Sequence, residues 1–200
     1  MTAEIKRVLF TGLGGVGQRH LRNVHAYLGD GVRLMAYRVR DLRQTLTPTL
    51  TVEKGVDFIE RHGVEVYKEL SAALEQEPDV VFVSNPTSMH MQVCIEAARA
   101  GCHLFIEKPL SHNEEGVDEL VTLCAEKNLV TLVGFQLRFH PCYLHLKRLL
   151  AEGCVGAPLS VHAEVGEYLP NWHPYEDYRQ SYASLPELGG GVVLSQIHEI

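Results

Sequence analysis

Short runs of apolar residues alternate along the first two thirds of the chain with longer stretches in which apolar residues recur every three or four positions. The short runs are typical of strands buried on both faces, and the longer spacing is typical of amphipathic helices. The predicted strands are residues 7–11, 32–38, 64–67, 79–84, 103–106 and 129–133. The predicted helices are residues 15–28, a segment ending near residue 63, and residues 70–75, 90–100 and 113–127. This alternation predicts an α/β fold built on a doubly wound parallel sheet.

The pattern changes after residue 133, which predicts a domain boundary there. We expect residues 1–133 to form one domain and residues 134–200 to begin a second, incomplete one. The last residue, Ile200, lies within an apolar stretch, so we expect the chain to be the N-terminal portion of a longer protein.

Four segments do not follow the strand-helix alternation. We expect a helix over 142–152, an alternating strand over 158–168 and a structured loop over 168–191, which is rich in Tyr and also holds the single Trp. Residues 44–51 carry Pro48 among four threonines and are expected to be a loop.

Charge and cysteine content mainly indicate which partners and sites are not expected. With 18 basic and 25 acidic residues, a net charge of −7 and no basic cluster, nucleic acid is not an expected partner. No apolar run approaches the roughly 20 residues of a membrane-spanning helix, and the N-terminus lacks the apolar core of a signal peptide. We therefore expect a cytoplasmic protein without a membrane partner that acts on a small molecule. The five cysteines have neither C-x-x-C nor metal-ligand spacing, which predicts reduced, mostly buried thiols and no metal site.

The strongest local signal is the sequence G-L-G-G-V-G, which begins at Gly12 between a predicted strand and a predicted helix. Gly12 permits a tight turn, Gly14 lets the backbone approach a pyrophosphate, and Gly17 allows close packing of helix and strand. Gly15 and Val16 then offer helix N-terminal N–H groups to the phosphates. The alternative is a glycine-rich turn without a ligand, and the strand-helix context favours dinucleotide binding.

Arg38 stands at the end of the second predicted strand, about 20 residues after the glycine motif, where an acidic residue would bind the ribose of NAD. A guanidinium matches the 2′-phosphate of NADP instead, and Arg40 follows closely. The alternative is that both arginines are solvated and that Asp41 or the main chain serves the ribose. The sequence therefore predicts an NAD(P) cofactor, with NADP slightly favoured.

Polar residues also follow the fourth and fifth predicted strands. Asn85, Pro86 and His90 come after the fourth, and Glu107 and Lys108 come after the fifth. Ligands of an open α/β sheet bind at the carboxyl ends of its strands, so we expect all five residues near the cofactor. A lysine in such a place is partly desolvated and can adjust its proton affinity to chemistry near neutral pH.

Together these motifs resemble the Gfo/Idh/MocA family of glucose-fructose oxidoreductase and inositol dehydrogenase. The resemblance rests on the glycine motif, on N-P-T-S-M-H from Asn85, on E-K-P-L from Glu107, and on the three consecutive glycines that lead to His198. It implies a Rossmann domain followed by an α/β (α+β) domain whose open sheet carries the substrate site and often the contacts of a homo-oligomer. It also implies that Lys108 and His198 are catalytic.

The activity that the resemblance implies is hydride transfer between a nicotinamide and a carbinol of a sugar, cyclitol or sugar derivative. The carbinol proton must leave with the hydride, so His198 is the expected base and Lys108 the cation that stabilises the developing alkoxide. Ser195 occupies a motif position that is commonly acidic. A dinucleotide-binding sensor or regulatory protein without catalysis is therefore kept as the alternative.

Candidate substrate ligands lie in the second part of the chain. Arg138, Trp172, Tyr175 and Arg179 combine aromatic faces that can stack on a sugar ring with polar groups that can bind its hydroxyls. The alternative for each is packing within the loop. The remaining histidines, His20 among them, have no partner spacing that indicates catalysis, and we assign them no role.

Overall fold

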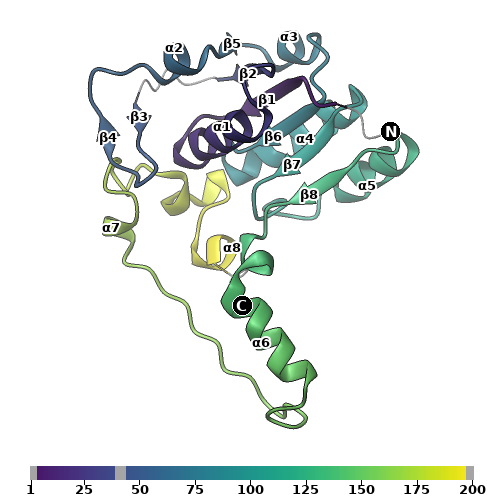
Figure 1. Ribbon diagram of the computed structural model, residues 1–200, viewed down its shortest axis with the longest axis vertical. Coiled ribbons are helices and arrows are strands. Elements are labelled where there is room, and N and C mark those ends of the chain that lie inside the picture. Colours follow the sequence, from purple (N-terminus) through teal and green to yellow (C-terminus); the bar gives the residue numbers. More distant parts are fainter. Residues whose placement is uncertain (1–3, 39–43, 197–200) are drawn as a thin grey trace.

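A computed structural model describes residues 4–38 and 44–196. Its central element is a six-stranded sheet in the order β5-β2-β1-β6-β7-β8 (Figure 1), and all neighbouring strands are parallel. The strands are β1 (Arg7–Thr11), β2 (Arg33–Tyr37), β5 (Glu65–Tyr67), β6 (Val80–Val83), β7 (His103–Ile106) and β8 (Thr131–Val133). The strand order reverses at β1, as in doubly wound dinucleotide-binding sheets. The predicted fold class is confirmed.

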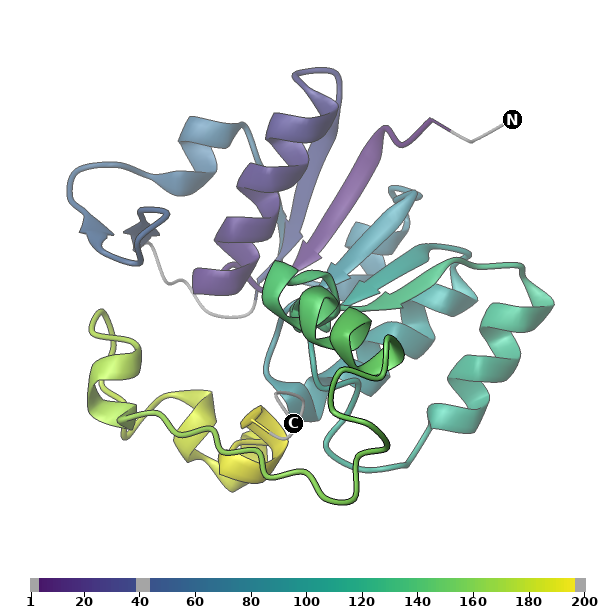
Figure 2. The same ribbon diagram turned by 60° about the horizontal axis from the view of Figure 1, so that its bottom comes forward.

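Helices cover both faces of the sheet (Figure 2). On one face lie α1 (Gly15–Leu28) and α2 (Phe58–His62), and on the other lie α3 (Leu70–Leu74), α4 (His90–Arg99) and α5 (Val117–Glu126). Successive residues of β1 alternate between the two faces, so Val8 and Phe10 pack under α1 while Leu9 packs toward α4. The middle residues of β1 and β2 are apolar because both of their faces are buried, whereas the edge strands β5 and β8 are largely exposed.

The segment expected to be a loop at 44–51 is loop and turn over residues 47–51, but the prediction is wrong for residues 45 and 46, which form one strand of a small hairpin. Its strands are β3 (Thr45–Leu46) and β4 (Val52–Glu53), which pair antiparallel. The side chain of Gln18 holds the hairpin to α1: its Nε2 donates to the Gln44 carbonyl at 2.7 Å, and its Oε1 accepts from the Leu46 N–H at 2.8 Å. A buried glutamine in the first turns of α1 thus supplies order that the local sequence does not.

The second part of the chain leaves the sheet after β8. The predicted helix is present as α6 (Pro141–Ala151), but none of its residues is buried. The strand predicted over 158–168 is wrong: this segment is extended and exposed, and among the described residues it has no strand to pair with. Short helices follow at α7 (Leu169–Trp172) and α8 (Val192–Gln196). Within residues 4–38 and 44–196 no helix is long and apolar enough to cross a bilayer.

The five cysteines are free, as predicted, but they are not mostly buried. Cys94 and Cys102 lie in the core, and burial raises the pKa of their thiols to about 12 and about 11. Cys124 is half-buried, whereas Cys142 and Cys154 are exposed. The two core thiols therefore stay protonated at neutral pH and pack as small apolar side chains.

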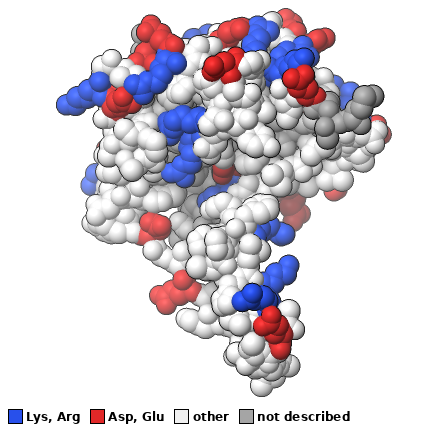
Figure 3. Space-filling view, in the orientation of Figure 1, with Lys and Arg blue, Asp and Glu red and all other residues white. Residues whose placement is uncertain are grey.

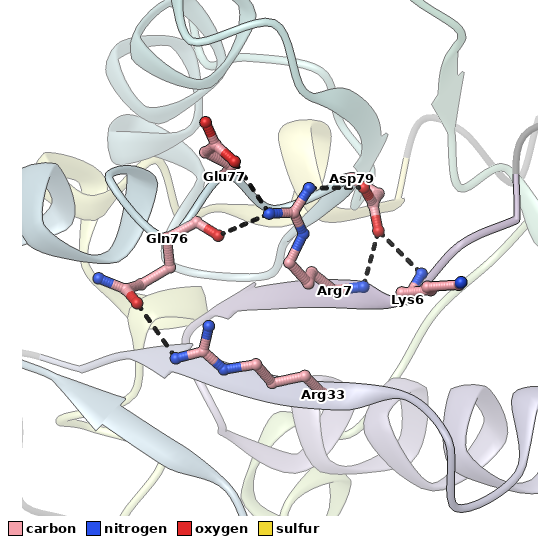
Figure 4. Close-up of polar contacts among 6 residues, drawn as sticks. All are labelled: Lys6, Arg7, Arg33, Gln76, Glu77 and Asp79. Atoms are coloured by element: carbon pink, nitrogen blue, oxygen red, sulfur yellow. Dashed lines mark hydrogen bonds and ion pairs between the residues drawn. The ribbon is translucent and has the colours of Figure 1, made fainter.

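A polar network lies where β1 and β6 begin, at the end of the sheet opposite the glycine motif (Figure 4). Asp79 precedes β6, and its Oδ2 accepts from the backbone N–H groups of Lys6 at 2.8 Å and Arg7 at 2.7 Å. The Arg7 guanidinium reaches Asp79 at 3.4 Å and Glu77 at 3.1 Å. The network joins the start of β1 to the start of β6, where the two central strands enter the sheet.

We expect Asp79→Ala to lower the free energy of unfolding by about 2 kcal/mol, because two N–H donors and a guanidinium lose a charged acceptor. Chemical denaturation measures this loss. The matched control is Glu77→Ala, since Glu77 also binds Arg7 but its side chain is 81% exposed. Exposed pairs contribute about 0–1 kcal/mol. Equal losses in the two variants would contradict the role given to Asp79.

The loss should also depend on pH. Burial alone would raise the pKa of Asp79, but the Lys6 and Arg7 N–H groups and the Arg7 charge outweigh it and lower the pKa below its ordinary value. A lowered folded pKa stabilises the fold above the unfolded value of about 3.9, and this stabilisation is lost as the pH falls through the folded pKa. The difference between wild type and Asp79→Ala should therefore shrink below about pH 4.

Candidate functional site

The glycine motif forms a tight turn between β1 and α1. Gly12 has a φ of +96°, and a Cβ there would lie 2.9 Å from the Ser84 carbonyl oxygen. A Cβ on Gly17 would lie 2.2 Å from the Gly12 oxygen. These two glycines are therefore required by the close approach of α1 to β1 and β6, as the motif predicts.

Open space lies where the motif predicts a pyrophosphate. A Cβ on Gly14 would meet no atom within 4 Å, and the φ of −68° at Gly14 is available to any residue. Gly14 is the N-cap of α1 and no side chain caps the helix there. The start of α1 thus has no side-chain cap and lies beside open space, an arrangement that suits phosphate.

Asn85 and His90 connect the end of β6 to the loop after β7. The Asn85 Oδ1 accepts from the Thr11 hydroxyl at 3.2 Å, while its Nδ2 is buried without a partner in the part of the chain that the structure describes. The His90 ring is 1% exposed and lies between the carbonyls of Asn85 at 2.9 Å and Pro109 at 3.0 Å. Burial lowers the pKa of His90. The buried His90 ring therefore links the turn after β6 to the turn after β7.

Lys108 follows β7 and precedes a cis peptide bond to Pro109. Its ammonium Nζ donates to the carbonyl of Ser195 in α8 at 3.2 Å. The Ser195 hydroxyl turns back along the chain and donates to the Gly191 carbonyl at 2.7 Å. Ser195 occupies the motif position that is commonly acidic, and it contacts Lys108 through its main-chain oxygen and not through its side chain.

Glu107 forms a close pair with His20 of α1. The distance from Glu107 Oε1 to His20 Nε2 is 2.6 Å, and the side chains are 18% and 17% exposed. The other oxygen, Oε2, accepts from the Lys108 N–H at 3.2 Å. The His20 ring packs edge-on against Phe105 and near Phe82, which fixes its orientation. The pair therefore anchors the backbone that carries Lys108.

His20, Glu107 and Lys108 line one cleft of about 570 Å³. Its walls are the first turns of α1, Leu50, the end of β7 and residues 132–136 and 139. The second part of the chain adds Glu167, residues 172, 173 and 175, and Gln196. The space-filling view shows the hollow in the middle of this face, with Lys and Arg side chains at its rim (Figure 3). Lys108 and Arg19 are the basic residues of its lining. The cleft lies at the carboxyl edge of the sheet, where such folds bind ligands.

The candidate substrate ligands divide into two groups. Trp172 and Tyr175 line the cleft. Arg138 does not; its guanidinium lies 5.9 Å from the ring centre of Phe135. Arg179 does not either; it covers the ring of the preceding tyrosine at 4.5 Å. Because neither Arg138 nor Arg179 lines the cleft, their role in binding substrate stays a prediction.

Arg38 does not line this cleft. It lines a separate small pocket together with Leu13 of the glycine turn and Asp57. This is the end of β2, where the sequence places the ribose of the adenosine half. Arg40, Asp41 and His198 lie outside the described residues.

The cleft-facing side of α1 is a part of the site that was not predicted from the sequence. Arg19, His20 and Asn23 line the cleft together with Gly15 and Val16. The available signal was helical spacing, because residues three and four positions apart share one face of a helix and this polar face continues directly from the glycine motif.

The described residues fit a dinucleotide. The open space at Gly14, the uncapped start of α1 and the unpartnered Nδ2 of Asn85 all lie at the carboxyl edge of the sheet. A pyrophosphate would meet the N–H groups of α1, and the amide of Asn85 would gain an acceptor. No group of three or more His, Cys, Asp or Glu side chains in the described ranges is arranged to hold a metal ion.

Comparison with known proteins places the chain among oxidoreductases. It is 28% identical over 153 residues to myo-inositol 2-dehydrogenase of Thermotoga maritima, covering 76% of this chain and 42% of that protein. It is 29% identical over 164 residues to levoglucosan dehydrogenase of Pseudarthrobacter phenanthrenivorans, covering 81% and 40%. The chain thus spans less than half the length of these relatives.

A solved structure agrees with the sequence relatives. The scyllo-inositol dehydrogenase of Lactobacillus casei, solved with bound NAD(H) and scyllo-inositol, superposes with a TM-score of 0.60 at 25% identity, covering 76% of this chain and 42% of that one. The family described as "Oxidoreductase family, NAD-binding Rossmann fold" matches residues 6–135. The chain belongs to this Gfo/Idh/MocA oxidoreductase family.

Proposed function

We propose that the protein is an NAD(P)-dependent oxidoreductase that transfers a hydride between the nicotinamide and a carbinol of a sugar, cyclitol or sugar derivative. The observation that carries this proposal is the position of Lys108, which lines the same cleft as Gly15 and Val16 at the start of α1. A cytoplasmic homo-oligomer acting on a carbohydrate-like substrate is part of the same proposal. Relatives that are named dehydrogenases of inositol and levoglucosan support this substrate class.

The chain's residues have distinct roles in this proposal. The nicotinamide, when bound, supplies the hydride acceptor or donor. Lys108 provides a cation for the alkoxide that develops on the substrate oxygen, and the His20–Glu107 pair holds the Lys108 backbone in place. Trp172 offers an apolar face of the kind that stacks on a sugar ring. His198 is the proposed base.

A dinucleotide-binding sensor is the second candidate, and Ser195 is the observation that favours it. A serine side chain is neutral, so the commonly acidic position supplies no charge beside Lys108. Its hydroxyl donates to the Gly191 carbonyl instead. A turnover screen over sugars, inositols and nucleotide-sugars, combined with a fluorescence titration of reduced cofactor into the full-length protein, separates the two. Saturable binding with turnover supports the oxidoreductase, binding without turnover supports the sensor, and no saturable binding refutes both.

We further propose that NADP(H) binds more tightly than NAD(H), because the Arg38 guanidinium at the end of β2 can bind the 2′-phosphate. Arg38→Ala should lower the preference for NADPH over NADH about tenfold, since a charged hydrogen bond contributes roughly 1.5–3 kcal/mol. The ratio of the two dissociation constants measures this effect. Arg99→Ala is the control, because Arg99 pairs with Glu119 on the far face of the sheet. An unchanged ratio in Arg38→Ala would refute the role of this side chain.

A further inference from the structure

The hydroxyl of Tyr175 lies directly over the start of α1. If Gly15 carried a Cβ, the Tyr175 Oη would lie 2.7 Å from it and the Leu50 Cδ2 would lie 3.4 Å from it. Gly15 is the first residue of α1, so a side chain from the second part of the chain reaches the backbone at the beginning of the glycine-motif helix.

Neighbouring aromatic rings fix the Tyr175 side chain in this position. The ring of Trp172 stacks on His173 at 4.2 Å with an angle of 15° between the planes, and His173 packs against Tyr175 at 5.2 Å. His173 Nδ1 also lies 2.9 Å from the Glu176 carboxylate. The hydroxyl therefore has a defined place over α1.

The chemistry of this hydroxyl suits an anion. Burial raises the pKa of Tyr175 to about 12, so at neutral pH it remains an O–H donor. Within residues 4–38 and 44–196 it makes no hydrogen bond. Arg19, one turn into α1, lines the same cleft and is close enough to oppose the rise of the Tyr175 pKa. A neutral donor and a cation thus lie beside the exposed N–H groups of α1.

We propose that Tyr175 donates a hydrogen bond to the dinucleotide's diphosphate, at the phosphate joined to the nicotinamide ribose. This inference rests on the proposed cofactor binding. The choice of phosphate follows from the cleft, because Tyr175 shares its cleft with Lys108, whereas Arg38 lies in the separate pocket at the end of β2. Tyr175 thereby becomes a cofactor ligand in place of the substrate ligand expected from sequence, and the second part of the chain completes the cofactor site.

The test is Tyr175→Phe in the full-length protein, with ADP-ribose and 5′-AMP as probes in calorimetric titrations. ADP-ribose carries both phosphates, and 5′-AMP lacks the one on the nicotinamide side. We expect the dissociation constant of ADP-ribose to rise about tenfold, since a hydrogen bond to a charged group is lost. The affinity for 5′-AMP should be unchanged.

Tyr168→Phe is the matched control, because Tyr168 begins the same segment but is 71% exposed. It should bind both probes as wild type does. Unchanged or tighter ADP-ribose binding by Tyr175→Phe would overturn the inference, and tighter binding would show that the hydroxyl obstructs the phosphate. Equal losses for both probes, or the same loss in Tyr168→Phe, would also overturn it. Failure of the wild type to bind ADP-ribose would refute the proposed function itself.

Discussion

Gly14→Val should fold as stably as the wild type and lose dinucleotide binding by at least about 100-fold, or roughly 2.8 kcal/mol. A Cβ at position 14 meets no protein atom within 4 Å, and the φ of −68° suits valine, so the substitution introduces neither a clash nor backbone strain. The new side chain would instead occupy the space beside the first N–H groups of α1, where the pyrophosphate is proposed to bind. Thermal unfolding and titration with reduced cofactor measure the two properties separately.

Two other glycines serve as controls for this result. Gly31→Val adds the same side chain at a second position where a Cβ meets nothing within 4 Å, and it should change neither stability nor affinity. Gly17→Val should destabilise the protein, because its Cβ would lie 2.2 Å from the Gly12 carbonyl oxygen. Wild-type affinity in a folded Gly14→Val variant would remove the pyrophosphate from the proposed site.

The sheet and its glycine turn were predictable because their signals are local. A strand buried on both faces reads as a short apolar run, and Gly12 and Gly17 are required where α1 follows directly on β1 and packs closely against it. The alternation of apolar and polar residues at 158–168 is also a local signal, but a strand forms only where a second strand is present to pair with it. Leu159 and Val161 are 98% and 85% exposed, so the pattern alone did not specify pairing.

The missed parts of the site depend on contacts between distant segments. His20 and Glu107 are 87 positions apart, and their pairing follows from the helix that begins at Gly15 lying over the end of β7. The position of Tyr175 over Gly15 likewise requires the second part of the chain to return to the first. An aromatic loop indicates that a ligand or a core is nearby, but it does not say which half of a cofactor the loop meets.

Lys108→Ala should lower the turnover of a confirmed substrate by at least about 10²-fold, while the dissociation constant of the dinucleotide stays nearly unchanged. Oxidation of a carbinol places negative charge on its oxygen as hydride and proton leave, and Lys108 is the lysine that lines the cleft among the described residues. Its cation stabilises that charge only as it develops, so its removal should appear in kcat more than in KM.

Steady-state kinetics and a cofactor titration on the same preparations decide this prediction. Lys68→Ala is the control, since Lys68 is exposed and does not line the cleft, and its turnover should match the wild type. Near-wild-type turnover in Lys108→Ala would eliminate the proposed mechanism, because no other described lysine lines the cleft. His198→Ala should cause a loss of the same order, since the resemblance makes it the base. If only His198→Ala retained activity, the proton acceptor would be another group, while Lys108 would keep its role as the cation.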